Sequence, residues 1–167
     1  MLQQAPCGHP RARSVLGSLG SVLVAGALVG GCSLFGDDDG TTEVAVTDVA
    51  VGECYRAPGE VTAEVTELDR VHCTEPHEQE AYANLPVTPG GEEPETYPGE
   101  AELKAFADGS CAEAFAEYVG VDYRDSALYF TYLLPTPRGW EAGDREVTCF
   151  VTTTGEQLTA SVRGTGA

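Results

Sequence analysis

The alternation of apolar and polar residues predicts several strands in the first half of the chain. Residues 44–51 are apolar and β-branched, which indicates an opening strand, and alternation resumes within 61–73 and again over 81–85. Residues 86–98 are rich in proline, glycine and glutamate and predict a surface loop. The first half therefore predicts β-structure.

The clearest element is a helix over residues 100–119. Gly120 follows it, where glycine commonly ends a helix. Because Cys111 falls on the apolar stripe, we expect its sulfur to point toward the core. The apolar residues recur at spacings of three and four, which is the helical period: Leu103, Phe106, Ala107, Cys111, Ala114, Phe115, Tyr118 and Val119.

The second half predicts more strands. Residues 126–134 are apolar on both sides, which favours a central strand covered on two faces. Residues 145–153 predict another strand, and 154–156 predict a turn into a short hairpin over 157–163. Strands before and after one long helix indicate an α+β fold, in which the helix packs on an antiparallel β-sheet.

The beginning of the chain has the pattern of an export signal. Residues 1–31 contain two arginines, then an apolar run, then a small-residue end. Residues 28–32, Leu-Val-Gly-Gly-Cys, resemble the lipobox of bacterial lipoproteins. The resemblance implies cleavage before Cys32, a diacylglyceryl group on its sulfur, and attachment to the outer face of the cytoplasmic membrane. An uncleaved anchor helix and a secretory signal cut elsewhere are the alternatives.

On this interpretation the chain has four parts. A lipoprotein signal peptide spans 1–31, and the lipidated cysteine with an acidic linker spans 32–43. The folded domain spans 44–163 and a short tail spans 164–167.

The charge excludes one class of partner. The chain has nine Lys and Arg residues against 27 Asp and Glu residues, a net charge of −18. Cleavage before Cys32 would remove two arginines and no acid, so the mature charge would be −20. Nucleic-acid binding requires cationic side chains, so we expect no nucleic-acid partner. The charge also opposes close contact with anionic headgroups. It favours a role in solubility over an acidic recognition surface.

Four cysteines remain after Cys32: Cys54, Cys73, Cys111 and Cys149. In an exported domain they predict two disulfides. Three pairings are possible and the sequence alone does not choose among them. We favour Cys54–Cys73 and Cys111–Cys149, one bridge in each half.

Three motifs are spaced along the folded part of the chain: Val51-Gly52-Glu53-Cys54-Tyr55, then Cys73-Thr74-Glu75-Pro76-His77, and Trp140-Glu141-Ala142-Gly143-Asp144-Arg145. Together they resemble the actinobacterial septum-formation domain family. The resemblance covers nearly all of the mature domain. It implies an envelope protein that is secreted, lipid-anchored or membrane-spanning, with a link to division septa, and it carries over no catalytic residues.

One cluster, His72, Cys73 and His77, has residue types that zinc prefers. Because a disulfide sulfur is not a thiolate ligand, we expect no metal and no cofactor here. We expect His77 to shape the turn after Cys73, with its ring hydrogen-bonded to a backbone group or carboxylate.

Trp140, Arg145 and His77 are the candidate partner-binding residues, because Trp and Arg are favoured at interface hot spots. The alternative, which we favour, is that Trp140 caps the core, Gly143 and Asp144 form a hairpin turn, and Arg145 pairs with an acid.

The mature serines stand in no recognised nucleophile motif. We therefore expect a non-enzymatic accessory or scaffold protein of the cell envelope. An extracytoplasmic small-ligand-binding module is the alternative, and a hydrolase is the third possibility.

Overall fold

The computed structural model describes residues 40–59 and 64–167. The expected signal segment, Cys32, most of the linker and the first residues of the predicted 61–73 strand lie outside the described residues. The elements are β1 (Thr42–Ala45), η1 (Val46–Asp48), β2 (Cys54–Tyr55), β3 (Glu67–Val71), β4 (Gln79–Pro86), η2 (Pro89–Gly91), α1 (Glu100–Val119), η3 (Tyr123–Asp125), β5 (Tyr129–Leu133), α2 (Pro137–Ala142) and β6 (Glu146–Thr152).

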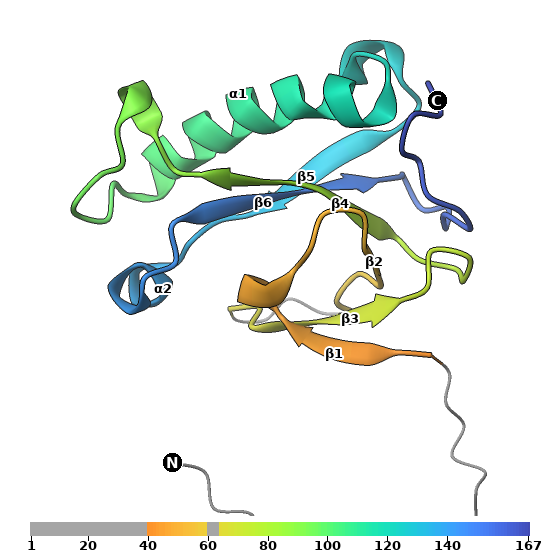
Figure 1. Cartoon of the computed structure of the whole chain (residues 1–167), viewed down its shortest axis with the longest axis horizontal. Helices are drawn as coiled ribbons and strands as arrows, with labels where there is room; N and C mark the ends of the chain where they lie inside the picture. Colours follow the sequence, from red (N-terminus) through yellow and green to blue (C-terminus); the bar gives the residue numbers. More distant parts are fainter. Residues whose placement is uncertain (1–39, 60–63) are drawn as a thin grey trace, which may run out of the picture. The chain divides into compact units, whose positions relative to one another are not determined.

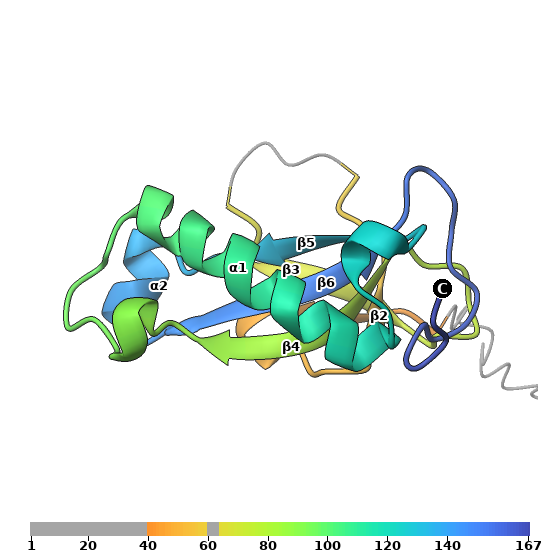
Figure 2. The ribbon, with the colours of Figure 1, turned by 90° about the horizontal axis from the view of Figure 1, so that it is seen from above.

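The six strands form one antiparallel sheet in the order β1-β3-β2-β4-β6-β5. The sheet curls, so that β1, β2 and β3 lie beneath β4 and β6, while α1 lies on the opposite side of β4, β5 and β6 (Figures 1 and 2). The α+β prediction of an antiparallel sheet with one long helix packed on it is confirmed.

Helix α1 has the predicted bounds, Glu100–Val119. Its apolar stripe is fully buried at Leu103, Ala107 and Phe115. Gly120 ends the helix in the left-handed conformation, with φ of 95°, and its N–H donates to the Ala116 carbonyl. That conformation costs a residue with a Cβ about 1–2 kcal/mol, which explains the glycine.

The curl creates two hydrophobic clusters. The first lies between α1 and the sheet and includes Cys149 and Val151 of β6. The second lies between the two layers of the curled sheet and comprises Val49, Tyr55, Leu68, Ala81 and Phe150. Because successive strand residues point to opposite faces, β6 contributes Cys149 to one cluster and Phe150 to the other.

The two disulfides are Cys54–Cys73 and Cys111–Cys149, the pairing favoured from the sequence. The first connects β2 to the segment after β3. The second joins α1 to β6 across the first cluster, with 38 residues of separation along the chain. Closing loops of this size stabilises a fold by roughly 3–4 kcal/mol in the chain-entropy account.

Two element predictions are wrong in part. The strand expected over 44–51 ends at Ala45, because the chain turns inward and buries Val49 in the second cluster. The strand expected to be central is β5, which lies at the edge of the sheet. It is apolar on both sides because Phe130 packs on the first cluster and Leu133 on the second.

The hairpin expected over 157–163 does not form. Leu158 makes a single β-bridge with His77, so this segment lies against the start of β4 instead of pairing with β6. The end of this segment is bound to Glu80, which accepts hydrogen bonds from the Ser161 hydroxyl and the Val162 N–H.

None of the helices in the described residues combines the length and the hydrophobicity that crossing a bilayer requires.

Candidate functional site

Helix α2 is short, and residues next to it in the chain determine where it begins and ends. The Thr136 hydroxyl accepts a hydrogen bond from the Gly139 N–H at 2.9 Å, and Pro137 occupies the first helical position. Gly143 ends the helix with φ of 101°. Gly143 and Asp144 therefore close a helix, and the hairpin turn expected there is wrong.

Trp140 and Arg145 hold α2 against the sheet. Trp140 is only 3% exposed, and the Arg145 guanidinium lies 3.9 Å from the centre of its ring. Arg145 also donates to the carbonyls of Trp140 and Asp144 and lies 3.6 Å from a Glu93 carboxylate oxygen. Trp140 thus caps the core and offers a partner almost no surface. The partner-binding role proposed for Arg145 stays a prediction.

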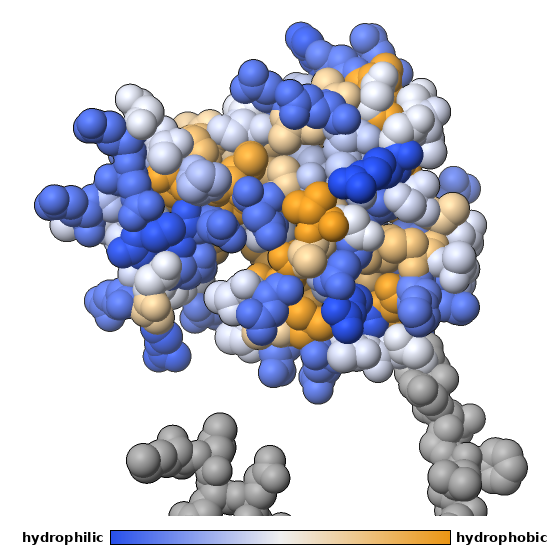
Figure 3. Space-filling view, in the orientation of Figure 1, coloured by the Kyte–Doolittle hydropathy of each residue, from blue (hydrophilic) through white to orange (hydrophobic). Residues whose placement is uncertain are grey.

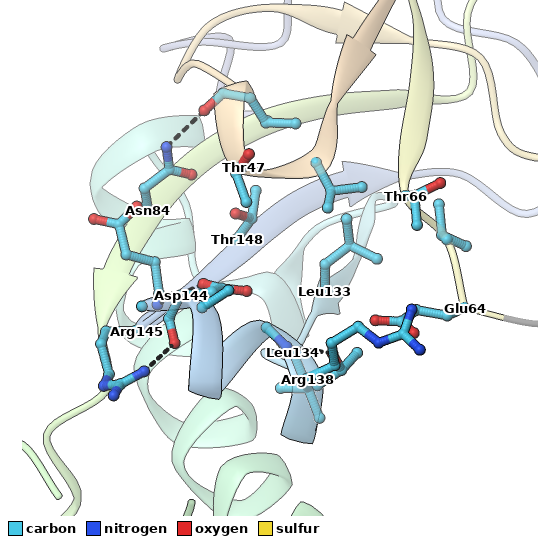
Figure 4. A pocket seen from close by; sticks show the side chains of 18 residues that line it. Thr47, Glu64, Thr66, Asn84, Leu133, Leu134, Arg138, Asp144, Arg145 and Thr148 are labelled. Atoms are coloured by element: carbon cyan, nitrogen blue, oxygen red, sulfur yellow. Dashed lines mark hydrogen bonds between the residues drawn. The ribbon is translucent and has the colours of Figure 1, made fainter. Parts of the chain in front are cut away.

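A groove of about 780 Å³ opens between α2 and the segments that follow β1 and precede β3. Figure 4 shows its lining side chains, and Figure 3 shows hydrophobic and hydrophilic residues side by side on this face of the molecule. Its volume lies within the range of small-molecule sites. The lining residues are Val46, Thr47, Val49, Glu64, Val65, Thr66, Asn84, Leu133, Leu134, Thr136, Arg138, Gly139, Ala142, Gly143, Asp144, Arg145, Glu146 and Thr148.

The floor of the groove is formed by β4, β5 and β6, through Asn84, Leu133 and Thr148 respectively. Asn84 donates its amide N–H to the Val49 carbonyl at 2.8 Å, which ties one wall to the floor. Thr148 is 7% exposed, and its hydroxyl makes no hydrogen bond to any residue that the structure describes. Figure 4 shows Thr148 on the floor, with Asn84 to one side and Leu133 to the other.

The charged residues of the groove stand around its rim. Asp144 accepts a backbone hydrogen bond from Glu146 at 3.2 Å. Arg138 and Glu64 lie close together at the end of the groove away from Arg145 (Figure 4), and within the described ranges Arg138 is in no ion pair. Because Arg145 is held by Trp140, the side chains free to meet a ligand are Glu64, Glu146 and Arg138.

A second polar cluster is buried beside the Cys54–Cys73 bridge. Possible ligand atoms of Cys54, His77 and Glu80 lie within 4.8 Å of one another. However, Cys54 is oxidised in the disulfide and cannot supply a thiolate. Both Glu80 oxygens already accept hydrogen bonds. The cluster therefore does not fit a metal ion in the oxidised protein.

The fully buried ring of His77 is held at the turn after Cys73. Its Nδ1 lies 2.8 Å from the Glu75 carbonyl, so this nitrogen carries the proton, which matches the backbone contact expected for His77. His72, by contrast, is exposed. With His77 buried and His72 at the surface, the two histidines predicted as a cluster occupy different environments.

Glu80 lies at the centre of this buried network. It accepts hydrogen bonds from Tyr118 Oη at 2.5 Å, Ser161 Oγ at 2.6 Å and the Val162 N–H at 2.8 Å. Burial, together with the hydrogen bond to Glu80, raises the pKa of Tyr118 to about 12. The network joins β4, α1 and the C-terminal segment.

Sequence reasoning missed both Glu80 and Thr148. Glu80 is one of 27 acidic residues, and its only signal is its place directly before the strand predicted over 81–85. Thr148 stands beside Cys149 in a predicted strand, where threonine is ordinary. The surroundings of both residues are formed by segments that are distant in the chain, so a local pattern does not indicate their roles.

Comparison with curated proteins finds no match, and neither does comparison with solved structures. Residues 51–166 match the family described as septum formation. The match covers more than half of the chain and includes both disulfides, the buried Glu80 network and most of the groove. The chain therefore belongs to the septum-formation family.

Proposed function

We propose that this protein is a lipid-anchored accessory of septum formation, which acts at the outer face of the cytoplasmic membrane by binding a partner and not by catalysis. The observation that carries the proposal is a septum-formation domain closed by two disulfides. Disulfides persist in oxidising compartments, which supports a location outside the cytoplasm.

The position of the groove suits a tethered protein. The described domain begins at Gly40, before β1, whereas the groove lies beyond the other end of β1. Figures 1 and 2 show the C-terminus at the same end as the start of β1. A lipid on Cys32 would therefore join the described domain through the end of β1 that does not line the groove. The net charge of −18 also favours a stand-off from anionic headgroups.

Intact mass spectrometry of the protein from its own cells tests the anchor. We expect a chain that begins at Cys32, carries a diacylglyceryl group and has no free thiol at Cys54, Cys73, Cys111 or Cys149. A Cys32→Ala variant should lack the lipid and leave the membrane fraction. A chain that retains Met1 and four free thiols would contradict the proposed location.

Fluorescence microscopy tests the septal role. A fusion to the C-terminus should be enriched at division septa relative to the lateral envelope, and crosslinking should recover envelope or division proteins above control. Uniform distribution with no recovered partner would contradict an accessory role at the septum.

The groove favours a second candidate function, the capture of a ligand outside the membrane. Its supporting observation is Thr148, which lines a ligand-sized groove and whose hydroxyl is open to the groove and in no hydrogen bond among the described residues.

A further inference from the structure

We infer that the groove beside α2 binds an extended peptide segment that carries lysine or arginine side chains. This inference rests on the second candidate function, ligand capture, and specifies its ligand class. It is independent of the lipid anchor and of the septal location.

The lining side chains favour a peptide over a ring ligand. None of the residues lining the groove is aromatic, so no platform is available on which a base or a sugar ring could stack. The groove is lined instead by aliphatic side chains, among them Val46, Val65 and Leu133, and by the hydroxyl-bearing Thr47 and Thr148. Aliphatic side chains and backbone amides of a peptide match these two kinds of surface.

The Thr148 hydroxyl supplies the specific contact. The residue is 7% exposed, and its hydroxyl is in no hydrogen bond within the part of the chain that the structure describes. The hydroxyl is not one of the buried atoms that lack a partner, so it is open to the groove. A backbone N–H or carbonyl of a bound peptide would replace water at this hydroxyl.

The free charges favour a cationic peptide. Glu64 and Glu146 are exposed and line the groove, and neither is in an ion pair among the described residues. Lysine and arginine bury an aliphatic stem and keep the charged head at the edge of an apolar surface. The chain's charge of −18 adds a long-range attraction for the same partner.

Arg138 tests whether the bound peptide is positively or negatively charged. Its positive charge is in no ion pair among the described residues, and it lies beside Glu64 in Figure 4. A cationic peptide is repelled by Arg138 and a peptide carboxylate is attracted to it. Removing its charge should therefore strengthen the binding of a basic peptide.

Isothermal titration calorimetry on the full chain in detergent tests the inference. The probe is a short blocked peptide of alternating lysine and valine. The comparison probes are the same peptide with glutamate in place of lysine and an oligomer of N-acetylglucosamine. Only the lysine peptide should bind, with an affinity that falls as salt is added. Trp140, the chain's one tryptophan, lies in α2 and provides a second readout by fluorescence.

Three variants assign the binding to the groove. Thr148→Val keeps the shape and should weaken binding about 3- to 10-fold, the range of one hydrogen bond. Glu146→Gln should weaken it about 2- to 5-fold, and Arg138→Gln should strengthen it about 2-fold, as expected for exposed charges. The matched control is Glu141→Gln, on α2 but outside the groove, which should leave the affinity unchanged.

Four results would overturn the inference: no binding of the lysine peptide, tighter binding of the glutamate peptide or the saccharide, equal losses for Glu146→Gln and Glu141→Gln, or weaker binding by Arg138→Gln. Circular dichroism checks that Thr148→Val is folded, and Glu146→Gln decides the matter if it is not. Failure of peptide binding leaves the mass and microscopy results of the septal proposal untouched, so the two proposals fail separately.

Discussion

Replacing Glu80 should lower the free energy of unfolding of this domain far more than replacing any exposed acid. The residue is fully buried, and its carboxylate accepts three hydrogen bonds, from Tyr118 at 2.5 Å, Ser161 at 2.6 Å and Val162 at 2.8 Å. Hydrogen bonds to charged groups contribute about 1.5–3 kcal/mol each, and buried donors left without an acceptor add their own cost.

Glu80→Gln keeps the shape of the side chain but replaces one accepting oxygen with a donating NH₂ group. Either the two hydroxyls or the Val162 N–H then lose their acceptor, so we expect a loss of about 2–4 kcal/mol in the free energy of unfolding. Tyr118→Phe removes one donor and should cost about 2 kcal/mol. Because both changes remove interactions from the same hydrogen-bond network, the double variant should cost less than the two losses added together, by about 1–2 kcal/mol.

Urea denaturation under oxidising conditions measures these losses. Glu78→Gln is the matched control, since Glu78 lies two residues earlier and its hydrogen bonds to Ala57 and Gln157 are exposed. It should cost less than about 0.5 kcal/mol. Equal losses for Glu78→Gln and Glu80→Gln, or additive losses for Glu80→Gln and Tyr118→Phe, would refute the claim that the buried carboxylate joins the C-terminal segment to α1.

Four further predictions concern stability. Replacing Cys111 and Cys149 together by alanine should lower the free energy of unfolding by about 4 kcal/mol, given the 38-residue separation, and a loss below about 1 kcal/mol in urea would contradict the loop-closure account. Because the pKa of Tyr118 is raised to about 12, the folded state keeps a proton that the unfolded state loses near pH 10, so stability should fall as pH rises from 10 to 12. Tyr118→Phe should flatten that fall by at most ~2.7 kcal/mol, compared in urea titrations at pH 9 and pH 12. Trp140→Ala should cost about 3–5 kcal/mol as monitored by circular dichroism, because the ring is buried beneath Arg145, whereas a near-neutral result would mean that the ring does not cap the core. Gly120→Ala should cost about 1–2 kcal/mol, because φ is 95° there, and thermal melts that superimpose on those of the wild type would exclude the left-handed end.

Much of the fold could be predicted because its signals are local. The stripe of α1 and the glycine at Gly120 act within a turn or two of helix, so the bounds Glu100–Val119 were readable from spacing. The strands β4 and β6 carry apolar residues at every second position, at 81, 83 and 85 and at 147, 149 and 151. The disulfide pairing was favoured on the simpler ground of one bridge per half, and the structure confirms it.

The position of a strand within a sheet is not a local property. The apolar residues on both sides of β5 indicated coverage of both faces, and that coverage exists, since Phe130 and Leu133 pack in different clusters. The inference from coverage to a central position failed because a curled sheet covers its own edge strand. The curl depends on pairings among β1, β2 and β3, which join segments up to 28 residues apart.

The sequence by itself determined the helix, the strand alternation, the four cysteines and the acidic charge, because each depends on neighbours along the chain or on a count. Only the tertiary structure decided that Trp140 is buried under Arg145, that Glu80 binds the C-terminal segment, and that Thr148 lines an open groove. Burial of a polar group depends on which distant segments pack over it. The groove lies between α2, the segment after β1 and the segment before β3, which are distant in the chain, so no local sequence pattern predicts it.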